Sequence, residues 1–382
     1  MVSATGLNTM GQRLYINGQP IQATHTDREW EQLPNAESPH MQEIRRFLQE
    51  WSAPTDRICV QTSGSTGKPK QLSVLKQHML ESARISCAYF GLTEKKRVLF
   101  ALPVGYIAGK MMLVRALHAG LDLYPIAPTG HPFQVEPPAN IPYDFAPLVP
   151  LQIYNSLQNP GETKGLLNCR QLLIGGSALD SDLEDRLRVL PNEIYMSYGM
   201  TETLSHIALR RINGTEASPY YQPLAGVRLR IDDEGCLLID AAHIGVHALH
   251  TNDRVNMRPD GTFRVLGRRD QIINTGGIKI EIEVLEQQLS EWIKQDFALT
   301  SVPDAKFGEA LVLIHTGKPI DVSLFQANVP AHCIPKHQRS VDALPRTDSG
   351  KIDRNQLKQL ASEHPSKIAS IKPPARNTGK DQ

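Results

Sequence analysis

The stretch that most limits what this chain can fold into is residues 62–70, Thr-Ser-Gly-Ser-Thr-Gly-Lys-Pro-Lys. Its two glycines, Gly64 and Gly67, let the backbone approach an anion closely and turn N–H groups toward it. The hydroxyl and lysine side chains add donors and positive charge. A P-loop would need four residues between its glycines and a hydroxyl residue after the lysine, whereas here the gap is two and Pro69 follows Lys68. The segment predicts a phosphate-binding loop of another kind. Taken alone, it could also be a solvated turn.

The composition indicates a globular protein of two domains. The 382 residues exceed the roughly 250–300 that one hydrophobic core usually supports. A net charge of +1 argues against nucleic acid or an anionic membrane surface as the main partner. The five cysteines are scattered and show no metal-binding spacing, which favours buried thiols in a reducing compartment. No signal peptide or transmembrane segment is visible, so we expect a cytoplasmic chain without membrane insertion.

Strand and helix patterns alternate in the first half of the chain, which predicts an α/β sheet with ligand loops at the strand ends. The expected strands are 98–102 and 172–174, and the expected helices are 72–90, 107–118 and one that starts with a capping box at 181–184. Eight prolines between residues 125 and 150 argue against regular structure there.

The sequence pattern changes near residue 227. From there on, short apolar runs separated by turns predict strands at 227–231, 236–239 and 263–266. We expect one domain over residues 1–269 and a compact α+β domain over 270–365. Residues 366–382 carry four basic residues against one acid, with two adjacent prolines, and are expected to form a disordered tail.

Four further motifs follow the loop in order. They are Ser-Tyr-Gly-Met-Thr-Glu-Thr at 197–203, Thr-Asn-Asp at 251–253, Gly-Arg-Arg-Asp at 267–270 and Pro-Arg-Thr-Asp-Ser-Gly-Lys-Ile-Asp-Arg at 345–354. With residues 62–70 they resemble the motifs of the adenylate-forming superfamily of acyl-CoA ligases, luciferases and peptide-synthetase adenylation domains. The resemblance implies a large N-terminal domain of α/β sheets with a small β-subdomain and a trimmed N-terminal part. A small, mobile α+β C-terminal domain would follow.

The resemblance also implies a reaction. A carboxylate is joined to the α-phosphate of ATP, pyrophosphate leaves, and the acyl group passes from AMP to the thiol of CoA. Lys351, Thr201 and Glu202 would be catalytic, with Glu202 on Mg²⁺. The ATP-binding residues implied by the matching motifs are Thr62, Ser63, Gly64, Ser65, Thr66, Gly67, Lys68, Gly175, Gly176, Ser177, Tyr198, Gly199, Met200, Asp253 and Arg268. The alternatives from the residues alone are a solvated carboxylate for Glu202 and a structural ion pair for Asp253.

Three positions bear on domain movement and CoA. Asp270 matches the family's hinge position, and Gly276 and Gly277 match glycines that face the pantetheine arm of CoA. Asn252 stands where the family usually has glycine. Asparagine tolerates positive φ better than most residues, which makes this departure mild.

Residues 103–112 occupy the place of the family's acyl-pocket motif. They contain no aspartate to pair a substrate amine, but Lys110 lies one helical turn beyond Tyr106. A ring and a cation together suit an aromatic acid with a second carboxylate, unless Lys110 faces solvent. With Ser205 and His206, these two residues form the expected substrate site. With these residues, the chain most resembles the o-succinylbenzoate–CoA ligases of menaquinone biosynthesis, in their compact bacterial form.

Other functions stay open. Within the class, the chain could activate another aryl or acyl acid, or load a carrier protein instead of CoA. From a different class, it could be a non-catalytic nucleotide- or acyl-sensing module, although Lys351, Glu202 and Asp253 together exceed what a binder needs. The expected partners are a carboxylic acid, ATP and CoA, with no nucleic acid, and a homodimer stays open.

Overall fold

The computed structural model describes residues 12–22, 27–61, 71–134, 142–179, 181–275, 277–347, 351–363 and 369–370. The chain divides into two compact units. Unit 1 takes Met1–Gly64, Lys68–Thr251 and Val255–Arg264, and unit 2 takes Ser65–Gly67, Asn252–Arg254 and Val265–Gln382. Within the described part, no helix is both long enough and apolar enough to span a membrane.

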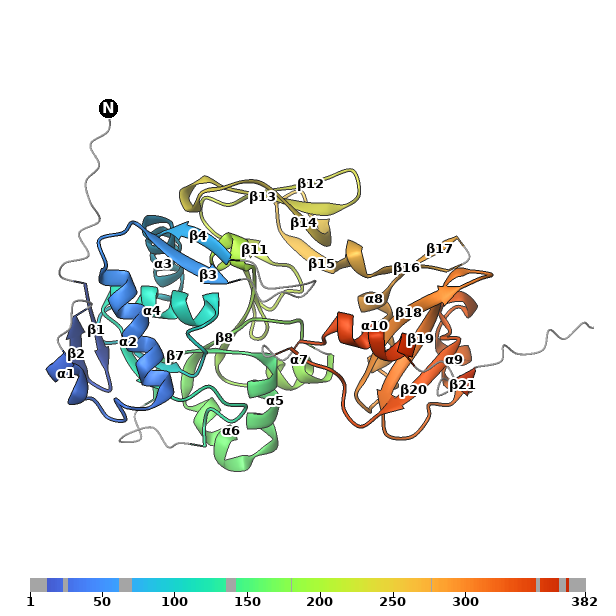
Figure 1. The fold of residues 1–382 in the computed structure, drawn as a ribbon, viewed down its shortest axis with the longest axis horizontal. Coiled ribbons are helices and arrows are strands. Elements are labelled where there is room, and N and C mark those ends of the chain that lie inside the picture. Colours follow the sequence, from blue (N-terminus) through green and yellow to red (C-terminus); the bar gives the residue numbers. More distant parts are fainter. Residues whose placement is uncertain are drawn as a thin grey trace, which may run out of the picture. The chain divides into compact units, whose positions relative to one another are not determined.

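A nine-stranded sheet is the framework of unit 1 (Figure 1). Its strands in spatial order are β11 (Gln222–Pro223), β10 (His206–Arg211), β9 (Glu193–Gly199), β8 (Cys169–Ile174), β7 (Tyr143–Leu148), β5 (Arg97–Phe100), β6 (Asp122–Pro125), β1 (Arg13–Ile16) and β2 (Gln19–Gln22). The five strands from β9 to β6 run parallel. The α/β prediction is therefore confirmed.

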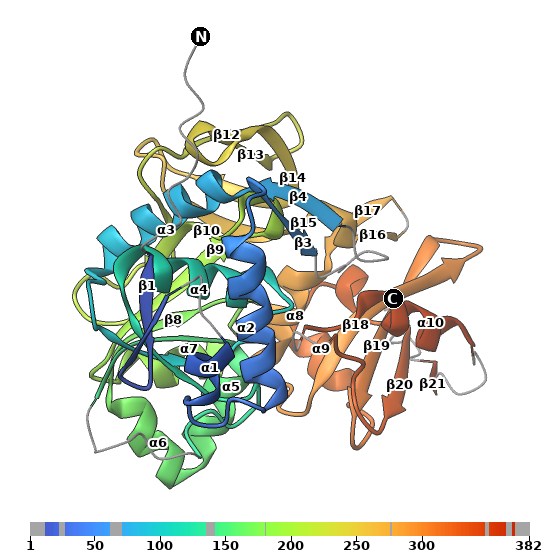
Figure 2. The same cartoon turned by 60° about the vertical axis from the view of Figure 1, so that its left-hand side comes forward.

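Successive side chains of each strand point to opposite faces of the sheet, and helices pack on the apolar side chains of both faces. Ala146 of β7 joins an apolar core with α5 (Pro150–Gln158), α6 (Pro160–Leu167) and α7 (Ser181–Arg188). Its neighbour Phe145 points to the other face, where Phe90 of α3 (Lys76–Phe90) lies 5.0 Å from it, ring centroid to centroid. Helix α4 (Ile107–Ala119) packs beside α3, and Figure 2 shows this pair on the side of the sheet away from α5 and α6.

The predicted helix over 72–90 begins later than expected. Residues Gln71–Leu75 form strand β4, which pairs antiparallel with β3 (Arg57–Gln61), and α3 starts at Lys76. Leu72, Ser73 and Val74 alternate between apolar and polar side chains as in a strand, and β3 supplies the pairing partner. The short helix α1 (Asp27–Glu31) and the longer α2 (Pro39–Ser52) precede this hairpin.

The prediction that residues 125–150 lack regular structure is wrong in its second half. Residues 143–148 form the buried strand β7 in the middle of the sheet. Pro147 lies near the end of that strand, beyond its pairing with β5 at Phe145. Pro150 takes the first turn of α5, where a missing N–H costs no hydrogen bond.

The predicted small β-subdomain is confirmed as a four-stranded sheet in the order β12 (Arg228–Ile231), β13 (Cys236–Ala241), β14 (Val246–Met257) and β15 (Phe263–Arg268). The sequence pattern missed β14, whose twelve residues carry the motif at 251–253.

Unit 2 contains a six-stranded sheet with helices packed on it. Its strands are β17 (Ile278–Glu281), β16 (Ile272–Thr275), β19 (Gly308–Thr316), β20 (His337–Val341), β21 (Ala369–Ser370) and β18 (Phe297–Asp304), which pairs with β19. Its helices are α8 (Ile282–Ser290), α9 (Val322–Asn328) and α10 (Arg354–Glu363). Residues 369–370 were expected to be disordered, but they pair with β20 because its outer edge is open to an antiparallel partner. The rest of the predicted tail lies outside the described residues.

Candidate active site

Three of the segments singled out in the sequence follow the carboxyl ends of parallel strands in unit 1. Residues 103–110 follow β5, residues 175–177 follow β8, and residues 200–203 follow β9. Ligands of open α/β sheets bind at this edge. The expected phosphate loop, residues 62–70, comes directly after β3 and lies outside the described residues.

Two glycines allow the ends of β8 and β9 to approach each other and the following turn. A Cβ on Gly175 would lie 2.7 Å from Ser197 Oγ, and one on Gly199 would lie 2.3 Å from the Ser205 carbonyl oxygen. Both distances are shorter than real contacts allow, so only glycine fits either position without a shift. Gly176 adds a φ of +98°, which glycine adopts freely. These glycines are therefore needed for the backbone path that the sequence assigned to the nucleotide.

The turn after β9 is a short 3₁₀ helix, η2 (Thr201–Thr203). The Thr203 hydroxyl accepts a hydrogen bond from the Met200 N–H at 2.9 Å and donates one to the Ser205 carbonyl at 2.8 Å. These bonds fix the turn with Thr201 buried and Glu202 exposed. An exposed carboxylate on a rigid turn can share a cation with a bound phosphate.

Tyr198 lies at the end of β9 with its ring packed among other rings. The Phe263 ring centroid is 5.1 Å from it in an edge-on arrangement, and the Tyr221 centroid is 5.9 Å away. This packing fixes the orientation of the ring. Its contact with adenine stays a prediction.

A buried arginine that the motif search missed lies at the predicted substrate residues. Arg115 of α4 is 3% exposed and donates a hydrogen bond from Nε to Ser86 Oγ at 2.9 Å. Its Nη2 donates to Ser205 Oγ and lies 3.4 Å from His206 Nδ1. Among the described residues, no carboxylate lies within ion-pair distance of it. The available signal was one charged residue in an otherwise apolar run, residues 111–117.

Burial lowers the pKa of the Arg115 guanidinium to about 10, so it stays a cation at neutral pH. His206 lies beside it with its Nε2 buried and without a hydrogen-bond partner in the described structure. Burial, assisted by the Arg115 charge, lowers the pKa of His206 well below 6.5. The pair therefore presents one positive charge and one neutral imidazole.

His206 should make the protein sensitive to acid. The unfolded chain would protonate this imidazole near pH 6.5, whereas the folded chain resists protonation, so unfolding takes up a proton below that pH. Stability from this residue is present above pH 6.5 and is lost as the pH falls below it. We expect His206→Gln to flatten the decline of the melting temperature between pH 7.5 and 5.5. His332→Gln, at an exposed position, is the matched control and should leave the slope unchanged.

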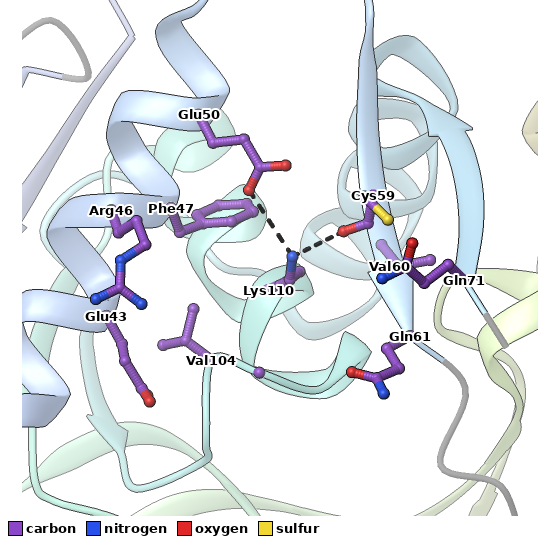
Figure 3. A pocket seen from close by; sticks show the side chains of 11 residues that line it. Glu43, Arg46, Phe47, Glu50, Cys59, Val60, Gln61, Gln71, Val104 and Lys110 are labelled. Atoms are coloured by element: carbon purple, nitrogen blue, oxygen red, sulfur yellow. Dashed lines mark hydrogen bonds and ion pairs between the residues drawn. The ribbon is translucent and has the colours of Figure 1, made fainter. Parts of the chain in front are cut away.

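Lys110 lies in a different environment, a pocket of about 250 Å³ between α2, β3 and the start of α4 (Figure 3). Its ammonium donates to the Cys59 carbonyl at 2.8 Å and lies 3.9 Å from a carboxylate oxygen of Glu50. The Phe47 ring centroid is 5.7 Å away. The side chain is 14% exposed, which excludes the alternative of a solvent-facing lysine. Tyr106 is at the N-cap position of α4, where its side chain makes no capping hydrogen bond, and its carbonyl accepts a hydrogen bond from the Lys110 N–H at 3.1 Å.

Unit 2 brings together the residues expected at the ribose. Asp253 of β14 is 8% exposed, and Arg268 Nη1 donates to it at 3.1 Å. The same guanidinium donates twice to Asp270, from Nε at 2.9 Å and from Nη2 at 2.8 Å. The ion pair with Arg268 was the alternative reading for Asp253, and it is present. It does not exclude ribose binding, since a carboxylate has further acceptor positions.

Lys351 also belongs to unit 2. The Thr347 N–H donates a hydrogen bond to the Lys351 carbonyl at 2.8 Å, and Arg346 and Ile352 form an antiparallel β-bridge. Burial lowers the pKa of the Lys351 ammonium, Arg268 lowers it further, and Asp253 and Glu283 oppose this. Arg268 and Asp253, the two residues expected at the ribose, therefore both influence the charge of Lys351. Of the two glycines expected at CoA, Gly277 has a φ of +81°, and Gly276 lies outside the described residues.

The chain is similar to known proteins over most of its length. The model of the AMP-binding enzyme family matches residues 11–246. A 2-succinylbenzoate–CoA ligase of Listeria monocytogenes is 27% identical over 353 residues, covering 83% of this chain and 73% of that protein. An acyl-CoA synthetase (AMP-forming)/AMP-acid ligase II-like protein from Dyadobacter fermentans matches in structure with a TM-score of 0.59 and 30% identity, covering 88% of this chain and 99% of that one.

A third match supports the fold alone. The o-succinylbenzoate CoA synthetase of Bacillus subtilis, solved with its acyl-adenylate intermediate, has a TM-score of 0.63 at 22% identity and covers 78% of this chain and 68% of that one. The family model spans more than half of the present chain, and the Dyadobacter protein is matched over nearly its full length. The chain therefore belongs to the AMP-binding enzyme family, the AMP-forming acid–CoA ligases.

Proposed function

We propose that this chain adenylates an aromatic acid with a second carboxylate, o-succinylbenzoate, and transfers the acyl group to CoA, a step of menaquinone biosynthesis. The observation that carries this proposal is the buried Arg115 beside Ser205 and His206. Several relatives at about 27% identity are 2-succinylbenzoate–CoA ligases, which supports the choice of acid.

The surroundings of Arg115 favour an anionic ligand. Taking a guanidinium out of water costs several kcal/mol unless a counter-charge compensates for it. Ser86 and Ser205 supply acceptor oxygens but no charge. The planar guanidinium matches a carboxylate in geometry, so the non-reacting carboxylate of the substrate is the group that would complete this site.

Lys110 remains the cation that the sequence pattern points to for this carboxylate. Its ammonium already faces Glu50 and the Cys59 carbonyl, so an arriving carboxylate would meet a site that is close to neutral. Arg115 has no such competitor among the described residues. We therefore place the second carboxylate at Arg115 and treat Lys110 as the comparison position.

ATP and Mg²⁺ complete the proposed reaction. A second structure of the Bacillus subtilis synthetase was solved in complex with ATP and a magnesium ion. In the present chain, Glu202 fits a magnesium ligand, because Mg²⁺ usually takes one or two carboxylates and fills its other positions with phosphate oxygens and water. Asp253 and Arg268 would hold the ribose, and the bound ion would reduce the repulsion between the two reacting anions.

We expect Glu202→Gln to lower kcat sharply and to weaken the dependence of the rate on Mg²⁺, because the amide lacks the charge that binds the ion. Pyrophosphate release measured across a Mg²⁺ titration checks this. Thr203 holds the same turn, so Thr203→Val serves as a control for disturbance of the turn. Kinetics of Glu202→Gln that match the parent at both limiting and saturating Mg²⁺ would contradict the metal assignment.

A panel of acids tests the function as a whole. Pyrophosphate release is measured with ATP, Mg²⁺ and o-succinylbenzoate, its analogue with the non-reacting carboxylate as carboxamide, benzoate and a fatty acid. Preference for the first acid supports the proposal, whereas preference for another acid assigns a different ligase. With the preferred acid, CoA and a carrier protein are then compared as acceptors. Release with no acid would favour the nucleotide- or acyl-sensing alternative.

A further inference from the structure

Asn252, which stands where the family usually has glycine, has a structural role in unit 2. Asn252 lies in β14 and is not among the residues with positive φ, so conformational tolerance does not explain it. Its Oδ1 accepts a hydrogen bond from Arg269 Nη2 at 2.8 Å, and its Nδ2 lies 3.4 Å from Asp270 Oδ2 as a donor. Glycine at this position could make neither contact.

These contacts converge on the turn η4 (Arg269–Gln271), which contains the expected hinge residue. Asp270 receives two hydrogen bonds from Arg268 and the longer one from Asn252. The turn is closed by the Ile272 N–H, which donates to the Arg269 carbonyl. Side chains from β14 and β15 therefore hold both Arg269 and Asp270.

The same network reaches the expected nucleotide site. The Arg268 guanidinium donates to Asp270 with Nε and Nη2 and to Asp253 with Nη1. A ribose at Asp253 would compete for the Nη1 contact of Arg268, which leaves the paired contact of Arg268 with Asp270 in place. The turn can therefore stay held while nucleotide is bound.

We propose that Asn252 is a positioning residue that holds the turn η4 in the conformation seen here. In this conformation Lys351 belongs to the same unit as Asp253 and Arg268. By holding the turn, Asn252 favours adenylation over thiol transfer. This inference rests on the proposed two-step function. It assigns to Asn252 a role that glycine at this position cannot perform.

Amide hydrogen exchange of the intact, ligand-free protein tests the holding role directly. We expect Asn252→Gly to speed exchange of the Ile272 amide about three- to tenfold, the effect of losing one or two exposed hydrogen bonds. Asn252→Asp keeps the acceptor for Arg269 but sets a second carboxylate against Asp270, so it should speed exchange more than glycine does. Arg230→Ala removes the exposed 2.8 Å pair with Asp240 in the β-subdomain and is the matched control, with no effect at Ile272.

The two half-reactions give the functional readout. Asn252→Gly should slow single-turnover pyrophosphate release about three- to tenfold, with an unchanged KM for ATP and an undiminished rate from supplied acyl-adenylate and CoA. A purely structural role would lower the melting temperature and slow both steps alike. Unchanged exchange at Ile272, or equal slowing of both steps, would overturn the inference. If the parent protein adenylates no acid, the proposed function fails, while the exchange result still decides whether Asn252 holds the turn.

Discussion

Replacing Lys351 by alanine is expected to lower the rate of pyrophosphate release by about 10²–10³, equivalent to roughly 3–4 kcal/mol of transition-state stabilisation. Negative charge develops on the α-phosphate oxygens as the carboxylate approaches, and an ammonium placed there stabilises the transition state more than the ground state. Burial lowers the pKa of the Lys351 ammonium, Arg268 lowers it further, and Asp253 and Glu283 oppose this, so the lysine lies close to the residues proposed at the ribose.

The second half-reaction supplies the control. Attack of a thiol on the acyl-adenylate develops no new negative charge at phosphate, so Lys351→Ala should convert supplied acyl-adenylate and CoA at close to the parent rate. Lys358→Ala, on the helix that follows, is the matched control and should leave both steps unchanged. Equal slowing of both steps in Lys351→Ala would mean that the lysine maintains structure, and its proposed role in adenylation alone would fail.

Replacing Arg115 by methionine should reduce kcat/KM for o-succinylbenzoate about 30- to 1,000-fold, the effect of removing one partner of a buried charge pair worth roughly 2–4 kcal/mol. The analogue with a carboxamide in place of the non-reacting carboxylate should lose far less. The fold should tolerate the change, because Arg115 carries no ion pair among the described residues, so its removal leaves no buried counter-charge unpaired there. Thermal melting at neutral pH checks that tolerance.

Lys110→Met is the matched comparison, since it removes a cation from the same helix. Its ammonium is already compensated by Glu50, so we expect a loss of less than about threefold on either acid. A large, selective loss in Lys110→Met together with a small one in Arg115→Met would move the second carboxylate to Lys110. Equal losses on both acids in both variants would mean that neither cation recognises the substrate.

The sequence by itself determined the class of fold, the family and the order of the motifs. Local chemistry suffices for these features: the apolar run 172–174, which ends at two glycines, predicts a buried strand, and glycines such as Gly175 and Gly199 are required by the backbone path itself. Residues 251–253 and 267–270 could be assigned to one function because each motif is contiguous in the chain.

The tertiary structure alone decided which distant side chains meet. Arg115 belongs to none of the sequence motifs. Only the packing of α4 against the turn after β9 brings it to Ser205 and His206, some 90 residues away in the chain. The strand at 71–75 depended on β3 as its partner, and β7, which contains Pro147, depended on neighbours that accept its hydrogen-bonding pattern. Asn252 looked like a tolerated replacement until its contacts with Arg269 and Asp270 were visible. A linear pattern records the propensity of each residue, whereas burial and pairing depend on neighbours that only the folded chain supplies.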